Sequence, residues 1–194
     1  MTRLRSAVAG LVGVVGLLTA GPATSQPPAQ KAKGRPTINE KVLDYAKKSL
    51  GERVGNGECW TLAHDALGAA GAKSSPQYRD FPSKDDYVWG DLVLAVTTKG
   101  GKQTEEVGPR KLSIAPGDII QFRGVVFSGP YPGGGNYTLT APRHTAVVAD
   151  VGPDGRTLGV LHQNWNGKRV VQELTFVLGD LTDGGVRVYR PLPR

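Results

Sequence analysis

Residues 55–71 read GNGECWTLAHDALGAAG, a glycine-rich turn followed by a segment with helical periodicity. In that segment small and apolar side chains recur at intervals of three and four residues, which places them on one face of an α-helix. The pattern predicts a helix that begins at Cys59 and ends at Gly71, with the thiol in the first turn on the inward side. The face that includes the thiol continues through Leu62, Ala63, Ala66, Leu67 and Ala70.

Cys59 is the only cysteine in the chain, and its position has two interpretations. The unpaired N–H groups and the positive end of a helix dipole stabilise a thiolate, which is the form of cysteine that acts as a nucleophile. A single cysteine is equally well explained as a small buried hydrophobic residue. The surrounding sequence has to distinguish a reactive thiol from an inert one.

The N-terminus has the layout of a secretory signal peptide. A basic stretch, residues 2–5, precedes an uncharged apolar stretch, residues 6–20, and small residues before Gln26 offer a cleavage site. The apolar stretch is short for a membrane span, and an uncleaved anchor is the alternative. We therefore expect residues 1–25 to be a signal peptide and the protein to be secreted, periplasmic or associated with the cell envelope.

The composition of the remaining chain is typical of one globular domain. Residues 26–36 are rich in Pro, Gln, Lys and Gly, which indicates a flexible linker, and residues 37–194 are long enough to bury a core. The net charge of +7 is a modest basic surplus that suits an anionic envelope. No arginine-rich run indicates nucleic acid. We expect a monomer that acts on an envelope peptide or amide and binds no nucleic acid.

The order of elements in this domain indicates an α+β fold. Thr37 and Glu40 have the spacing of a capping box, and they precede an amphipathic helix that we expect to end at Gly51. Residues 87–98 fit a helix or a strand, and residues 127–142 are predicted to be a long loop of a kind that is often functional. Two N-terminal helices are thus expected to pack on an antiparallel sheet. Its strands are predicted over residues 119–126, 144–151, 157–165, 169–177 and 186–190.

A turn signal at residues 152–155 allows the two strands beside it to be aligned. If the hairpin is regular about its centre, His144 lies opposite Gln163 to within one position. Cross-strand partners share a face of the sheet, so His144 has either His162 or Asn164 as a neighbour on its own face. The same alternation predicts that Gln163 and Trp165 point to the other face.

A thiol nucleophile needs a base to take its proton, and the base needs a third polar group to fix its tautomer and orientation. Cys59, His144 and either His162 or Asn164 meet that requirement if the cysteine helix packs beside the histidines. His64 lies five residues after Cys59, about 140° around the helix axis, so we expect it outside the site. The same spacing argues against a zinc site, and we expect no metal and no cofactor.

Four short segments carry a resemblance to a known family. Residues 57–60 read GECW, 116–120 read PGDII, 144–148 read HTAVV and 161–165 read LHQNW. In this order they are similar to the cysteine helix, the turn into the first core strand, the histidine strand and the third-residue strand of CHAP and NlpC/P60 proteins. One departure is Arg143, which precedes the histidine where the family usually has glycine.

This resemblance implies a papain-like fold with a triad of Cys, His and a polar residue. It implies Cys59 as the nucleophile and His144 as the base. The third position is divided between His162, where CHAP members often carry glutamate, and Asn164, which matches their asparagine. The oxyanion of an acyl-transfer reaction would be held by the backbone N–H of Cys59, with Asn56 as a candidate second donor.

The substrate is left open by these residues, and the resemblance implies hydrolysis of amide or peptide bonds in peptidoglycan. Trp60 and Trp165 are candidate substrate-binding residues. One alternative is a non-catalytic envelope-binding domain of the same fold, in which Trp60, Trp89 and Trp165 stack on sugars. Another is an amidase or transferase that acts on substrates outside the cell wall.

Overall fold

The computed structural model describes residues 35–75, 87–131 and 134–194. The predicted signal peptide, residues 1–25, and all but the last two residues of the predicted linker lie outside the described part of the chain. Within the described ranges, no helix is both long enough and apolar enough to cross a membrane.

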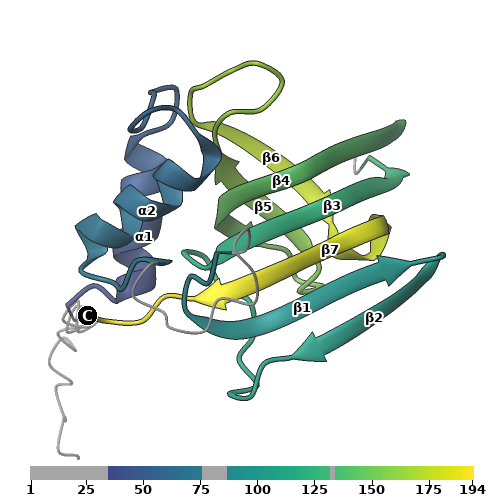
Figure 1. Ribbon diagram of the computed structural model, residues 1–194, viewed down its shortest axis with the longest axis horizontal. Helices are drawn as coiled ribbons and strands as arrows, with labels where there is room; N and C mark the ends of the chain where they lie inside the picture. The colour runs from purple at the N-terminus through teal and green to yellow at the C-terminus, as the bar shows by residue number, and fades with distance from the viewer. Residues whose placement is uncertain (1–34, 76–86, 132–133) are drawn as a thin grey trace, which may run out of the picture. The chain divides into compact units, whose positions relative to one another are not determined.

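Two helices and a seven-stranded antiparallel sheet make up most of the described residues (Figure 1). The strands lie in the order β2-β1-β7-β3-β4-β5-β6, so the last strand of the chain is inserted between β1 and β3. Figure 1 shows the two helices together at one end of the strands, with the strands extending beyond them. The elements are α1 (Ile38–Lys48), α2 (Cys59–Ala70), β1 (Asp91–Lys99), β2 (Lys102–Val107), β3 (Ile119–Pro130), β4 (Asn136–Val151), β5 (Thr157–His162), β6 (Gln172–Val177) and β7 (Leu181–Arg190).

The first helix begins as predicted and ends earlier than predicted. The capping box is present: the Thr37 side chain accepts a bond from the Glu40 backbone N–H, and the Glu40 carboxylate accepts one from the Thr37 backbone N–H. The helix ends at Lys48 instead of reaching Gly51, because Leu50 leaves the helix and forms an isolated bridge with Val171.

The second helix agrees with the sequence pattern at both ends. It begins at Cys59, and Gly71 closes it in the left-handed conformation with φ of 73°. Glycine is the residue that adopts this C-terminal geometry with least strain. The predicted apolar face, from Leu62 to Ala70, is buried.

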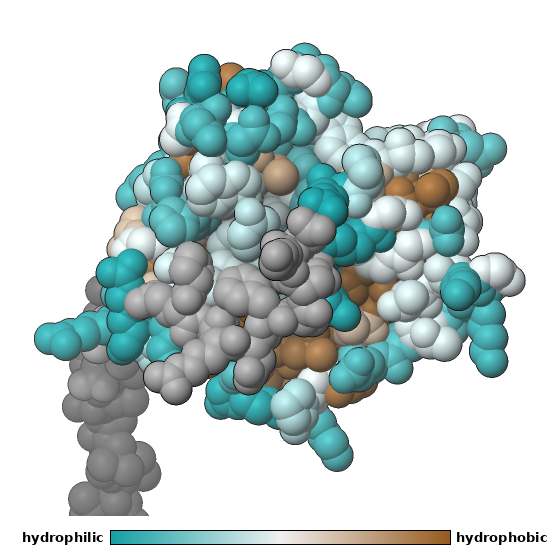
Figure 2. Space-filling view, viewed as in Figure 1, coloured by the Kyte–Doolittle hydropathy of each residue, from teal (hydrophilic) through white to brown (hydrophobic). Residues whose placement is uncertain are grey.

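Alternate residues of the central strands supply two separate buried clusters, one on each face of the sheet. Ile120 and Val148 belong to a cluster built by the strands. Their neighbours Ile119 and Val147 belong to a second cluster, which also contains Leu62 of α2. On the face in Figure 2, brown hydrophobic residues reach the surface in patches bordered by hydrophilic ones. Because the second cluster contains Leu62 of α2 and Val147 of β4, it joins the cysteine helix to the strand that carries His144.

The predicted loop at residues 127–142 is wrong, because most of it forms paired strand. Phe127 of β3 pairs with Leu139 of β4, and both side chains are buried. The pairing passes over Gly124 and Pro142, where a proline without an N–H donor leaves a gap in the ladder. Glycines and prolines in this segment concealed the alternation of buried and exposed side chains that is typical of a strand.

Smaller departures affect five other strands. The ambiguous segment at 87–98 is a strand, β1. Its hairpin partner β2 was not predicted because its side chains are mostly exposed and show no apolar alternation. The remaining strands differ at their ends: β5 ends at His162 instead of Trp165, β6 begins at Gln172 and β7 begins at Leu181.

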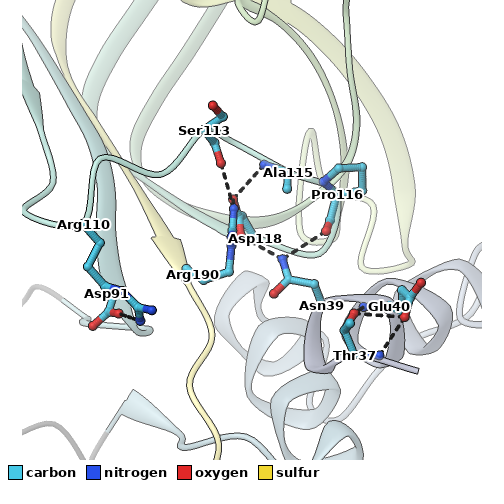
Figure 3. Close-up of polar contacts among 10 residues, drawn as sticks. All are labelled: Thr37, Asn39, Glu40, Asp91, Arg110, Ser113, Ala115, Pro116, Asp118 and Arg190. Atoms are coloured by element: carbon cyan, nitrogen blue, oxygen red, sulfur yellow. Dashed lines mark hydrogen bonds and ion pairs between the residues drawn. The ribbon is translucent and has the colours of Figure 1, made fainter. Parts of the chain in front are cut away.

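A buried carboxylate joins α1, the turn before β3 and the end of β7 (Figure 3). Asp118 is fully buried, and its Oδ2 lies 3.1 Å from Nη2 of Arg190. Its Oδ1 accepts a bond of 2.8 Å from Asn39, and Oδ2 accepts one of 2.8 Å from the Ala115 backbone N–H. Gly117 allows this close approach, because a Cβ there would lie 2.2 Å from the Asn39 carbonyl oxygen.

Substitution of Asp118 by alanine is expected to lower the free energy of unfolding by about 3 kcal/mol, because it leaves the partly buried Arg190 without its counter-charge. The matched control is Asp44→Ala, which removes an exposed i,i+4 pair with Lys48 and is expected to cost less than about 0.5 kcal/mol. Urea unfolding of both variants measures the difference. Equal losses would contradict a central role for Asp118.

Candidate active site

A pocket of about 210 Å³ lies where the first turn of α2 meets β3 and β4. Cys59 and Trp60 line it from the helix, and His144 and Thr145 line it from β4. The predicted nucleophile and the predicted base therefore both line this pocket, although His144 pairs with Phe122 and its side chain projects to the face opposite that of Thr145. Its remaining lining residues are Tyr87, Gln121, Arg123 and Arg143.

The two strand histidines are in direct contact. Nε2 of His144 lies 2.9 Å from Nδ1 of His162, and both side chains are buried. Since Nε2 is engaged in this bond, Nδ1 is the ring nitrogen of His144 that is left to exchange a proton with another group. Of the two candidates for the third position, the structure brings His162 to the base.

Asn164 contacts a different group. Its Nδ2 donates a bond of 2.7 Å to the carboxylate of Glu58, the residue before the cysteine helix. The strand has ended at His162, and Asn164 adopts a left-handed φ of 61° that redirects the chain. Asn164 therefore contributes to the helix start, and it makes no bond to His144 among the described contacts.

The predicted direction of Trp165 is wrong, because the strand alternation stops before this residue. Its ring packs edge-on against His144, with centroids 4.9 Å apart, and against His162, at 5.4 Å. The indole thus packs against both rings of the histidine pair. Gln163 does point to the opposite face, as predicted.

Gln163 is a site residue to which the sequence pattern gave no role. Its Nε2 lies 3.0 Å from the Val54 carbonyl oxygen and 2.7 Å from that of Glu58, and its Oε1 accepts the Val54 N–H at 3.1 Å. The amide thereby joins the end of β5 to the turn before α2. The signal for this residue in the sequence was a polar side chain between two candidate site residues, His162 and Asn164.

A second amide supports the backbone of the base. Gln121 donates a bond of 2.8 Å to the His144 carbonyl oxygen. Its own carbonyl oxygen accepts bonds of 3.0 Å from the Thr145 hydroxyl and from the Trp89 indole. A glutamine inside the apolar strand segment IIQF, residues 119–122, was the signal for this residue in the sequence.

The other predicted residues occupy the margin of the site. The Asn56 side-chain oxygen accepts the Glu58 backbone N–H at 3.0 Å, so this side chain is engaged in the turn. Trp60 stacks with Tyr87 in the pocket wall, with ring centroids 6.4 Å apart. His64 packs edge-on against Trp60 on the helix and does not line the described pocket.

Burial dominates the acidity of the thiol. It raises the pKa of Cys59 above its usual value, and the negative charge of Glu58 acts in the same direction. Backbone N–H groups of Thr145 and Trp60 lower the pKa but do not compensate for burial. The thiol is therefore protonated at neutral pH, and the stabilisation expected from the helix end is outweighed.

Both histidines of the pair are neutral at pH 7. Burial, assisted by the neighbouring His162, lowers the pKa of His144 to about 3. Burial alone lowers the pKa of His162 to about 4. The resting site therefore holds a neutral thiol and a neutral imidazole rather than a thiolate–imidazolium pair.

Comparisons with known proteins identify the fold. A model of the AIM3/BBC1 cysteine proteinase-fold domain matches residues 22–194. Over 156 residues the chain is 30% identical to Altered inheritance of mitochondria protein 3 of Debaryomyces hansenii. The aligned region covers 80% of this chain and 16% of that protein. The chain thus spans 16% of the length of this curated relative. The match agrees with the predicted papain-like class, although it names neither CHAP nor NlpC/P60.

Two solved structures are also similar. A crystal structure of Ly7917 with the hydrolyzing product of MDP has a TM-score of 0.41 and 20% identity, and covers 80% of this chain and 63% of its own. A second crystal structure of Ly7917 has a TM-score of 0.40 with the same identity and coverage.

Cys59 is expected to react slowly with iodoacetamide at pH 7, because burial raises the pKa of its thiol. The native protein should be alkylated at least about 10-fold more slowly than the chain unfolded in urea, in which the thiol has an ordinary pKa. The rate should keep rising with pH beyond the point at which a free thiol is fully ionised. Faster alkylation of the native protein would indicate a preformed thiolate.

The stability of the fold is expected to fall on acidification. The histidines bind protons in the unfolded chain at a pH at which they stay neutral when buried in the folded chain. With folded-state pKa values of about 3 for His144 and about 4 for His162, stability is complete above about pH 6.5 and is lost progressively below it. Near pH 5, His144→Asn should reduce the slope of unfolding free energy against pH by about 1.4 kcal/mol per unit. Urea titrations from pH 4.5 to 7 measure that slope. The same slope in His144→Asn as in the wild-type protein would contradict the prediction.

Proposed function

Because the chain belongs to the family of AIM3/BBC1 cysteine proteinase-fold domains, we propose that it hydrolyses amide bonds through a thioester at Cys59. The observation that carries this proposal is the 2.9 Å contact between His162 and His144, a residue that lines the same pocket as Cys59. A thiol, a base and a group that orients the base are the parts that acyl transfer requires.

The first half of the reaction forms the thioester. The Cys59 sulfur attacks the amide carbonyl carbon while its proton moves to Nδ1 of His144. Nε2 of His144 keeps its proton and donates it in the bond to Nδ1 of His162, so His162 carries its own proton on Nε2. When the tetrahedral intermediate collapses, His144 gives the proton to the leaving amine and the carbon–nitrogen bond breaks.

The second half releases the acid. Water gives a proton to Nδ1 of His144 as its oxygen attacks the thioester carbonyl. The carbon–sulfur bond then breaks, and His144 returns the proton to the Cys59 sulfur. The thiol and both neutral imidazoles are restored.

The start of α2 supports stabilisation of the oxyanion. Glu58, at the N-cap, makes no side-chain capping bond. The backbone N–H groups of Cys59 and Trp60 lower the pKa of the thiol, so they lie beside the sulfur, next to the carbonyl that it would attack. With the Asn56 side chain engaged in the turn, these N–H groups replace it as the proposed donors.

The substrate class is an amide or peptide, and the resemblance to CHAP and NlpC/P60 proteins adds peptidoglycan as one candidate. Export, with residues 1–25 as a cleaved signal peptide, would take the domain to such a substrate. The N-terminal sequence of the mature protein tests export. Peptides unrelated to peptidoglycan are the alternative substrates in the same test.

A second candidate function is binding without turnover. It is favoured by the resting protonation states, because an imidazole whose pKa is about 3 is a weak base toward a thiol whose pKa is raised. In this function the pocket walls, including Trp60 and Tyr87, would bind an envelope ligand. Binding that persists in Cys59→Ala, with no bond cleaved, distinguishes it from hydrolysis.

The hydrolase is tested with fluorogenic peptide amides and with digests of peptidoglycan, whose products are identified by mass spectrometry. Cys59→Ala should abolish cleavage, and His144→Ala should reduce kcat/KM about 1,000-fold. Cleavage that persists in Cys59→Ala would exclude a thioester at this residue.

The orienting residue is tested by a matched pair of substitutions. His162→Ala is expected to reduce kcat about 100-fold because His144 loses the acceptor that fixes its tautomer, and His162→Asn should restore part of the loss. Asn164→Ala should reduce kcat by less than about 10-fold, because its amide bonds to Glu58. The opposite ranking would assign the orienting role to Asn164.

A further inference from the structure

A second and larger pocket opens beside that of Cys59. It has a volume of about 440 Å³ and is lined by β1, β3 and β7. Gln121 and Arg123 line both pockets, so the two pockets adjoin on the sheet. We call the larger pocket, with the wall that it shares, the arginine groove; its charged lining residues are Lys99, Arg123, Asp183 and Arg187.

The strand register places the cations of this groove on the face that carries Gln121 and Thr145 of the cysteine pocket. Arg187 of β7 pairs with Gln121 of β3, which pairs with Thr145 of β4. Two residues along the strands, and so on the same face, Arg123 of β3 pairs with Arg143 of β4. Cross-strand partners share a face, so three arginines project from the same side of the sheet as Thr145, whose N–H faces the thiol.

A glycine accounts for the hollow. Gly185 of β7 pairs with Arg123 on one side and with Thr97 on the other, at the middle of the groove. Its missing side chain leaves the floor low between two strands that carry larger residues. Figure 1 shows the two described helices at the other end of the sheet, and they do not extend over this part of the face.

Charge gives the groove its selectivity. Lys99, Arg123 and Arg187 line it together with a single carboxylate, Asp183, and Arg143 adds a further cation at the cysteine pocket. Guanidinium groups bind carboxylates through paired, charge-assisted hydrogen bonds. The three arginines also have interactions within the chain, which a ligand would share or replace.

We propose that the arginine groove binds an acidic part of the substrate, so that the protein prefers amides with a carboxylate near the bond at Cys59. This inference rests on the proposed hydrolase for its link to Cys59. Thr145 and Arg187 are two strand spacings apart, about 10 Å, which an extended peptide spans in about three residues. The preferred carboxylate therefore lies about three residues from the scissile bond.

The binding arm of the test requires no turnover. Two fluorescent peptides are compared on the Cys59→Ala protein, one with glutamates two to four residues from a central amide and one with glutamines there. The glutamate peptide should bind at least about 10-fold more tightly at 50 mM NaCl, and the difference should shrink at 300 mM. Equal affinity of the two peptides would overturn the proposal.

Matched variants locate the binding. Arg187→Gln and Arg123→Gln should each remove most of the difference between the peptides, whereas Lys41→Gln, the same charge change on exposed α1, should leave it unchanged. Arg187→Lys guards against misfolding, because it keeps the charge and should retain part of the preference, and circular dichroism checks the fold of each variant. A loss in Lys41→Gln equal to that in Arg187→Gln would indicate general charge attraction and overturn the proposal.

The wild-type protein then separates this inference from the proposed hydrolase. Preferential cleavage of the glutamate peptide, lost in Arg187→Gln, supports both. Arginine-dependent binding without cleavage or acylation of Cys59 upholds the groove and removes the hydrolase. Cleavage of both peptides with equal kcat/KM upholds the hydrolase and overturns the groove.

Discussion

The buried amide of Gln163 is the interaction on which the geometry of the site depends. It bonds to the backbone of Val54 and Glu58, in the turn that leads into the cysteine helix. It also directly follows His162, so one side chain joins the start of the helix to the histidine pair. Because Gln163 is fully buried and Val54 nearly so, loss of the amide would leave buried donors and acceptors of the Val54 backbone unsatisfied. Gln121 acts similarly on the His144 carbonyl oxygen, so two glutamines position the backbones from which the thiol and the base project.

The parts predicted correctly from the sequence are those in which local chemistry and periodicity agree. The capping box at Thr37 and the helix from Cys59 to Gly71 depend on nearby residues alone, and both are present. The prediction that His144 lies beside either His162 or Asn164 followed from a hairpin whose turn is short, and the structure selects His162. In each case the determining contacts lie close in sequence or on adjacent strands, where side-chain period is a reliable guide.

The parts that were missed depend on contacts that no local pattern encodes. Residues 127–142 look like a loop because glycine and proline obscure the alternation, yet pairing with a neighbouring strand and burial of Phe127 and Leu139 make them sheet. Trp165 was assigned to the wrong face because the strand stops at His162 and Asn164 takes a left-handed φ. The uncapped helix start showed where a thiolate would be favoured, but the degree of burial, which decides the pKa, appears only in the folded chain.

The choice of an imidazole as the partner of His144 determines which protonation states the site favours. A carboxylate would stabilise an imidazolium through its charge, whereas neutral His162 accepts the hydrogen bond without contributing negative charge. With both rings buried, the pKa of His144 falls to about 3 and the thiol keeps its proton. In the proposed reaction, the negative charge that develops as the thiol loses its proton would then be stabilised by the backbone N–H groups of Thr145 and Trp60 around the sulfur. The acyl transfer proposed at Cys59 would therefore depend on donors that receive negative charge more than on the strength of the base.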